Sequence, residues 1–303
     1  MRIATTQYQD TMNSALQNAG ARLQGVMKQM ATGQRILVPS DDPITSVRIS
    51  RITREEAALT QYRDNISALS THLQHSETAL DGMVQNMLQV RDLLVWASDG
   101  SNTSADVNAM ASSLIALRDS LFYSGNNKDQ EGRYLFSGTL SNTPTVTYTA
   151  ANPVGSRYSF TGNTVTQLVV VGAGITQPSN TTLEEMPALL NLLDTAIQAM
   201  QAPGVSVNNP VTHTLVSQAL DGVDITLGSI SSKIAGLGGA QNILSALDSN
   251  HSNVSLSNKQ AIITLVQLDY SEAATRLSAY NASLQATQKA YSKVSTLSLF
   301  DVI

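Results

Sequence analysis

Residues 43–97 read PITSVRISRITREEAALTQYRDNISALSTHLQHSETALDGMVQNMLQVRDLLVWA, with no proline after Pro43. Proline inside a helix costs about 3 kcal/mol, so its absence permits one uninterrupted helix. From Tyr62 to Leu94 the heptad positions follow spacings of four and three, the a/d pattern of helices that pack on other helices. We predict a 55-residue helix, about 80 Å long, which a single globular domain rarely contains.

Proline divides the rest of the chain. Six of the eight prolines fall within residues 144–210, whereas residues 211–303 contain none. Turn residues at 99–106 (DGSNTSAD) separate the long helix from a third helix, whose apolar spacing again alternates three and four. The pattern predicts helical arms on both sides of a proline-rich insert.

Both ends of the chain carry narrow apolar seams suited to helix–helix contact. The seam residues that we single out are Met12, Leu16, Leu23, Val26, Met30, Leu277, Tyr280, Leu284, Tyr291 and Val294. Isolated helices with so little to bury are marginal in water. We therefore expect residues 1–40 and 265–303 to be mobile in the free subunit and to order on assembly. The alternative is a stable intramolecular hairpin of the two arms.

The insert reads differently. TVTYTA (145–150), RYSFTG (157–162) and TQLVVVG (166–172) are rich in β-branched residues and predict short strands, and Leu183 to Met200 predicts a helix. The fold class is mainly α, with long helical rod or coiled-coil arms from both termini and a small inserted α+β, β-rich domain. We expect three domains, listed here by range: terminal arms at 1–42 plus 262–303, a helical rod at 43–137 plus 205–261, and an outer insert at 138–204.

Composition excludes several functions. The chain has no cysteine, which removes thiolate metal sites and thiol nucleophiles. Net charge is +3 over residues 1–63, −9 over 64–253 and +1 over 254–303, and an acidic middle argues against a nucleic-acid partner. No apolar run approaches the roughly 20 residues that span a bilayer, and no cleaved secretory signal opens the chain, so we expect no membrane insertion.

The sequence gives little evidence for a catalytic or cofactor-binding site. The glycine run at 235–242 (AGLGGAQN) lacks a preceding strand and a GK[ST] ending, so it indicates a helix break or close helix packing. His72 and His75 lie i, i+3 on a helix without a completing carboxylate, and we interpret them as a solvated pair. No nucleophile–base motif is present. We expect no enzyme activity, no cofactor and no metal.

Four motifs resemble the bacterial flagellin family. They are MATGQRILVPSDDP (30–43), the helix from Tyr62 to Gly100, YLFSGT (134–139) and the end LDYSEAATRLSAYNASLQATQKAYSKVSTLSLFDVI (268–303). The SDDP loop and the LSLFDVI end are closer to the members that join hook to filament. The resemblance covers about four fifths of the chain.

The resemblance implies a structural subunit of the flagellum that forms a ring on the preceding hook-associated protein and templates flagellin through its terminal arms. Implied partners are copies of itself, that protein, flagellin, an export chaperone and the type III export apparatus. It implies an extracellular location at the hook–filament junction, after export without a cleaved signal. A minimal filament flagellin and a secreted coiled-coil adhesin with a binding insert remain as alternatives.

Charges near the first arm are further candidates for assembly contacts. They are Arg35, Asp41, Asp42, Arg48, Arg51 and Arg54. Such pairs set register and partner choice more than affinity. A solvated face is the alternative. Independently of this, Ser40 or one of the aspartates is expected to cap the long helix, with Pro43 in its first turn.

Overall fold

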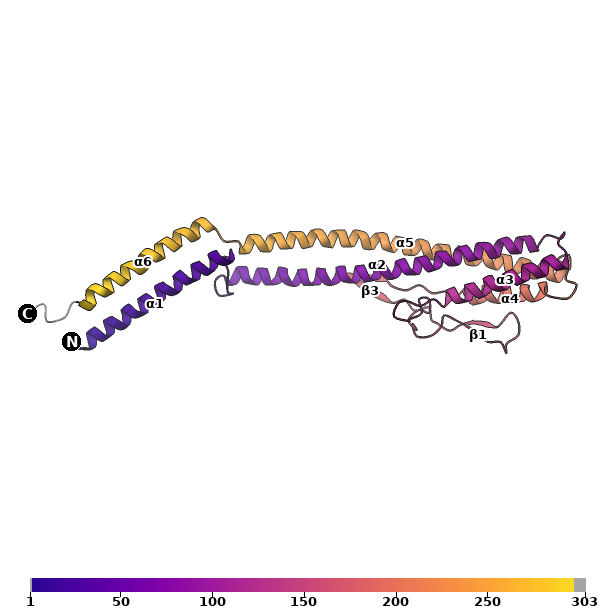
Figure 1. Cartoon of the computed structure of the whole chain (residues 1–303), viewed down its shortest axis with the longest axis horizontal. Helices are drawn as coiled ribbons and strands as arrows, with labels where there is room; N and C mark the ends of the chain where they lie inside the picture. The colour runs from indigo at the N-terminus through magenta and orange to yellow at the C-terminus, as the bar shows by residue number, and fades with distance from the viewer. Residues whose placement is uncertain (1, 297–303) are drawn as a thin grey trace, which may run out of the picture. The chain divides into compact units, whose positions relative to one another are not determined.

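The computed structural model describes residues 2–296, with the side chains of residue 7 and residues 9–293. These residues form six helices and four strands, and they divide into two compact units. The first unit combines residues up to 58 with residues from 253 onward, and the second comprises residues 59–252. The mainly helical fold class with a small strand-containing insert is confirmed (Figure 1). The three-domain division stays a prediction.

The first unit contains α1 (Arg2–Thr32), the first turns of α2 (Pro43–Ala97), the last turns of α5 (Pro210–Val266) and α6 (Tyr270–Thr296). α2 begins and ends at the predicted residues. Asp42 caps it, because its Oδ1 accepts a hydrogen bond from the Thr45 backbone N–H at 3.1 Å.

The second unit holds the remainder of α2 and α5 with α3 (Ser104–Gly125), α4 (Met186–Met200) and two hairpins. Strands β1 (Val146–Tyr148) and β2 (Tyr158–Phe160) pair antiparallel, as do β3 (Leu168–Gly172) and β4 (Ile175–Pro178). A capping box starts α3, in which the Thr103 and Asp106 side chains each accept from the other's backbone N–H. The first three strands and α4 confirm the predicted elements of the insert.

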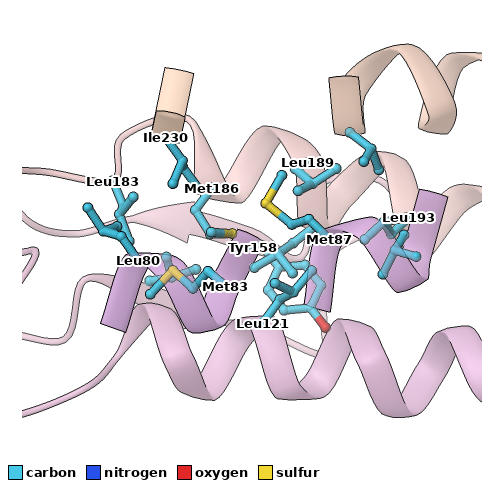
Figure 2. Close-up of a cluster of buried hydrophobic side chains, with 14 of the residues drawn as sticks. Leu80, Met83, Met87, Leu121, Tyr158, Leu183, Met186, Leu189, Leu193 and Ile230 are labelled. Carbon is cyan, nitrogen blue, oxygen red and sulfur yellow. The ribbon is translucent and has the colours of Figure 1, made fainter. Parts of the chain in front are cut away.

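One hydrophobic core joins these elements (Figure 2). Leu80, Met83 and Met87 are fully buried and follow the predicted seam of α2. They face Leu121 of α3 and Met186 of α4 in the same cluster. The a/d seam of α2 is therefore the core face of the second unit, and the insert packs on the helices through it.

Three predictions were wrong. The glycine run neither breaks α5 nor packs closely, because Gly236, Gly238 and Gly239 lie inside a continuous helix with open space where a Cβ would stand. Strand β4 was not predicted, because it ends at Pro178, which lacks a backbone N–H donor and argues against a strand. His72 is not solvated: it is half-buried, and burial lowers its pKa below the usual 6.5.

Candidate assembly interface

The terminal arms lie against each other. α1 and α6 are in contact along the first unit (Figure 1), which is the intramolecular hairpin given above as the alternative. Val26 is buried with Leu268 and Ala273, and Met30 and Tyr280 pack against that cluster. The remaining predicted seam residues whose side chains are described, Met12, Leu16, Leu23, Leu277, Leu284 and Tyr291, are half-buried. The side chain of Val294 lies outside the described residues.

The two links between arms and rod are bonded to each other. The Arg35 N–H donates to the Val266 carbonyl at 2.7 Å, and the Leu268 N–H donates to the Gly33 carbonyl at 3.0 Å. Gly33 has φ +69°, and a Cβ there would stand 3.2 Å from the Tyr270 hydroxyl, so glycine suits this position on both grounds. The link between α1 and α2 therefore lies beside the link between α5 and α6, and the two links form a single junction.

The two predicted acidic residues organise the loop that follows Gly33. Asp41 Oδ2 accepts from the Leu37 and Val38 backbone N–H groups at 2.9 and 3.0 Å. Asp42 Oδ2 accepts from the Thr45 hydroxyl at 2.7 Å and from Arg35 at 3.1 Å. The bonds from Thr45, with the smaller effect of Arg35, lower the pKa of Asp42. These contacts hold loop and helix cap together, so an intersubunit role of Asp41 and Asp42 stays a prediction.

The other predicted cations stand apart. Arg48, Arg51 and Arg54, here called the α2 arginine cluster, are exposed at i, i+3 and i+6 in the first turns of α2. None of the three forms an ion pair with a described side chain, and Arg54 donates only to its own helix, at the Ser50 carbonyl. Three unpaired cations on one short stretch make a surface that favours an acidic partner.

Sequence reasoning missed the apolar residues beside this cluster. Ile44 is 85% exposed and Val47 is 69% exposed. Val47 borders a hollow of about 490 Å³ with Pro39, Pro43 and Arg54. Both apolar residues lie off the seam that starts at Tyr62, so the a/d pattern did not mark them. Their signal was a β-branched residue on an arginine-rich helix start, where a solvated face would carry polar residues.

The nearby end of α5 carries a second exposed apolar surface. Leu256 lines a hollow of about 780 Å³ together with Arg48, Gln260 and Leu265. Ile263, one helical turn before Val266, is also exposed. In this first unit, α2 and α5 therefore both carry exposed apolar residues. Exposed apolar residues on neighbouring helices are typical of a surface that another chain covers.

Two further kinds of site, a metal centre and a membrane-spanning helix, have strict structural requirements. Among residues 2–296 no group of three or more His, Asp or Glu side chains is arranged to hold a metal ion. Within the same range, no helix combines the length and apolarity needed to cross a membrane.

Similarity to known proteins agrees with these features. Residues 3–141 match the family model described as the bacterial flagellin N-terminal helical region. A solved structure from Vibrio parahaemolyticus, assigned as a flagellar hook-associated protein, is 31% identical, with a TM-score of 0.67 over 74% of this chain and 99% of that one. The chain belongs to the bacterial flagellin family.

Two curated members of this family match end to end. Flagellar hook-associated protein 3 of Escherichia coli K12 is 27% identical, and the match covers 100% of this chain and 99% of that protein. Flagellar hook-associated protein 3 of Salmonella typhimurium is 26% identical with the same coverage. The family's helical arms, which the sequence motifs suggested, are thus present at both ends of a chain of matching length.

Proposed function

We propose that this chain is the structural subunit that joins the flagellar hook to the filament. The observation that carries the proposal is the end-to-end similarity to two proteins named flagellar hook-associated protein 3. The paired arms α1 and α6 and the exposed apolar surface at the start of α2 support it, because they are the features of a subunit that acts by association. The chain in this proposal catalyses no reaction.

The proposed partners follow from that position. Copies of this chain form a ring, the preceding hook-associated protein lies below it, and flagellin assembles above it. The arms and the α2 arginine cluster form the contact surface, and the seam residues from Met12 to Val294 take part in it. Export proceeds through the flagellar type III apparatus with a chaperone and without a cleaved signal, and the assembled subunit is extracellular.

The test is deletion of the gene and complementation with the full chain. We expect the deletion strain to make hooks without filaments and to release monomeric flagellin into the medium, as seen by electron microscopy and immunoblotting. The full chain should restore filaments and motility. Normal filaments in the deletion strain would reject the junction function.

A charge series sharpens this test. The variant Arg48→Glu/Arg51→Glu/Arg54→Glu should be exported yet fail to restore filaments, because it reverses three neighbouring exposed charges of the proposed contact surface that form no ion pair with a described side chain. The matched control Arg48→Lys/Arg51→Lys/Arg54→Lys keeps the positive charge and should restore them. Equal motility with both variants would remove the cluster from the contact surface.

A further inference from the structure

The turn between α2 and α3 (Figure 1) carries a hollow that the proposed function does not use. Its volume is about 590 Å³, and it is lined by Val95, Trp96, Asp99, Asn102, Asp106 and Met110. Trp96 is the single tryptophan of the chain and is 68% exposed. We call this site the Trp96 hollow. A large aromatic side chain left in water costs free energy that a partner can recover.

Hydrogen bonds fix the shape of this turn. Asn102 donates to the Trp96 carbonyl, and the Ser101 N–H donates to Asp99 Oδ1 at 3.0 Å. Asp106 closes the capping box of α3 with Thr103. The walls of the Trp96 hollow are therefore held in place before any partner arrives, which lowers the entropic cost of binding.

Both carboxylates in the hollow are negatively charged at neutral pH. Hydrogen bonds from Ser101 lower the pKa of Asp99, and those from Thr103 lower the pKa of Asp106. Neither carboxylate forms an ion pair with a side chain in the described part of the chain. Both hydrogen bonds from Thr103 to the Asp106 carboxylate end on Oδ2, so its Oδ1 accepts none from the described residues.

This combination selects a cation with an apolar stem. The indole face attracts a guanidinium through the ring quadrupole, and two carboxylates supply charge and acceptor oxygens. Val95 and Met110 offer apolar surface to the methylene groups behind the charged head. An arginine side chain meets all three requirements.

We propose that the Trp96 hollow of one copy receives the α2 arginine cluster of a second copy. The proposal rests on the proposed function, which requires copies to associate. The two surfaces are complementary in two ways: unpaired arginines meet unpaired carboxylates, and exposed Ile44 and Val47 meet exposed Trp96 and Val95. Because the two patches differ, the contact is heterologous, and such contacts build rings or helical layers.

Two complementary variants of the full chain test the contact. The first, Arg48→Glu/Arg51→Glu/Arg54→Glu, keeps the Trp96 hollow but has no cation to offer. The second, Trp96→Ala, keeps the arginines but has no indole. Tryptophan fluorescence in the mixture then comes from the first variant alone, since the chain has one tryptophan. Sedimentation velocity measured alongside reports association, and circular dichroism confirms that both variants are folded.

The expected result is complementation. The emission of the first variant should not depend on its own concentration, and adding the second variant should shift it to shorter wavelength as heterodimers appear. Self-association of each variant alone should be at least tenfold weaker than that of the unmodified chain. The charge-conserving variant Arg48→Lys/Arg51→Lys/Arg54→Lys should associate better than the Glu variant.

Three results would overturn the proposal. They are an unchanged emission in the mixture at concentrations where the unmodified chain associates, no association of the unmodified chain at its highest soluble concentration, and an equal shift on adding a chain that carries both sets of substitutions. The Trp96→Ala chain separates this idea from the junction function. If it restores filaments as well as the unmodified chain does, the hollow has no role while the junction function stands.

Discussion

The arms and the bundle follow the same heptad spacing and bury very different amounts of surface. In the arms, α1 has one partner helix, and their shared cluster buries Val26, Leu268 and Ala273. In the second unit, α2 is covered by α3, α4 and α5, and the same spacing yields fully buried residues such as Leu80 and Met87. The comparison teaches that an a/d seam indicates a contact, whereas the number of covering helices decides how much the contact stabilises.

Hydrogen exchange tests this comparison with the largest expected effect. Amides of α1 and α6 in the free chain should exchange orders of magnitude faster than those of α2 around Met83, because a thin seam opens locally while the core opens only on global unfolding. Mass spectrometry on the full chain measures this. Equal protection in both regions would show that the arms are as stable as the bundle and would contradict the ordering-on-assembly hypothesis.

The next largest expected effect is the loss of stability when the buried ion pairs of Asp194 are broken. Asp194 is 5% exposed at its side chain and binds Arg118 at 2.9 Å and Arg157 at 3.5 Å. Asp194→Asn leaves buried guanidinium charge less compensated, so the free energy of unfolding should fall by about 2–3 kcal/mol. Chemical denaturation of the full chain measures the change.

Asp224→Asn is the matched control. It removes an exposed partner of Arg91 and should cost less than about 0.5 kcal/mol, because water screens exposed pairs. Equal losses in the two variants would mean that burial does not set the strength of these pairs.

Three glycines of α5 that have open space beside them offer a gain in stability of similar size. Gly236→Ala, Gly238→Ala and Gly239→Ala should each raise the free energy of unfolding by about 0.5–1 kcal/mol, because alanine restricts the unfolded chain and meets no neighbour. Thermal denaturation of the triple variant measures the sum. Gly138→Ala is the opposite control: Gly138 has φ +73° and a Cβ there would collide with the Asn163 backbone, so stability should fall.

The smallest expected effect is the contribution of His72 to the pH dependence of the free energy of unfolding. Burial lowers its pKa below 6.5, so the unfolded chain binds its proton at higher pH than the folded chain. The stabilising contribution is present above pH 6.5 and is lost as pH falls through the lower, folded pKa. His72→Gln should flatten the pH dependence of the free energy of unfolding in this window. An unchanged pH dependence in His72→Gln would show that burial of this imidazole does not set it.

Much of the fold followed from local rules. Proline placement and a/d spacing located α2 from Pro43 to Ala97, and Asp42 was among the predicted caps. β4 escaped because its signal is short and depends on pairing with β3 across a turn. The half-burial of His72 was not predicted because it depends on residues far along the chain that line the same hollow, such as Tyr134 and Gln167, and no local pattern encodes them.

The candidate site was only partly visible in the sequence. The arginine cluster and the arm seams could be read from spacing and charge. The exposure of Trp96 could not, because the sequence does not show which side of the helix end stays uncovered, and the signal at Ile44 lay outside the a/d pattern that was used. Asp41 and Asp42 were predicted as contact charges, and one of them as the cap of the long helix; the structure shows local contacts of both in the loop before α2, and the intersubunit role stays a prediction.

The bonded junction between the two helical strands has a mechanical consequence. Gly33 and Arg35 in the link after α1 bond to Leu268 and Val266 in the link before α6, so a bend at one link strains the hydrogen bonds to the other. The two hydrogen bonds couple the links, so the junction moves as one unit. A twisting load that enters through either strand is shared by both. A rotating shaft built from such subunits can bend at these junctions while the paired helices of each subunit stay in contact.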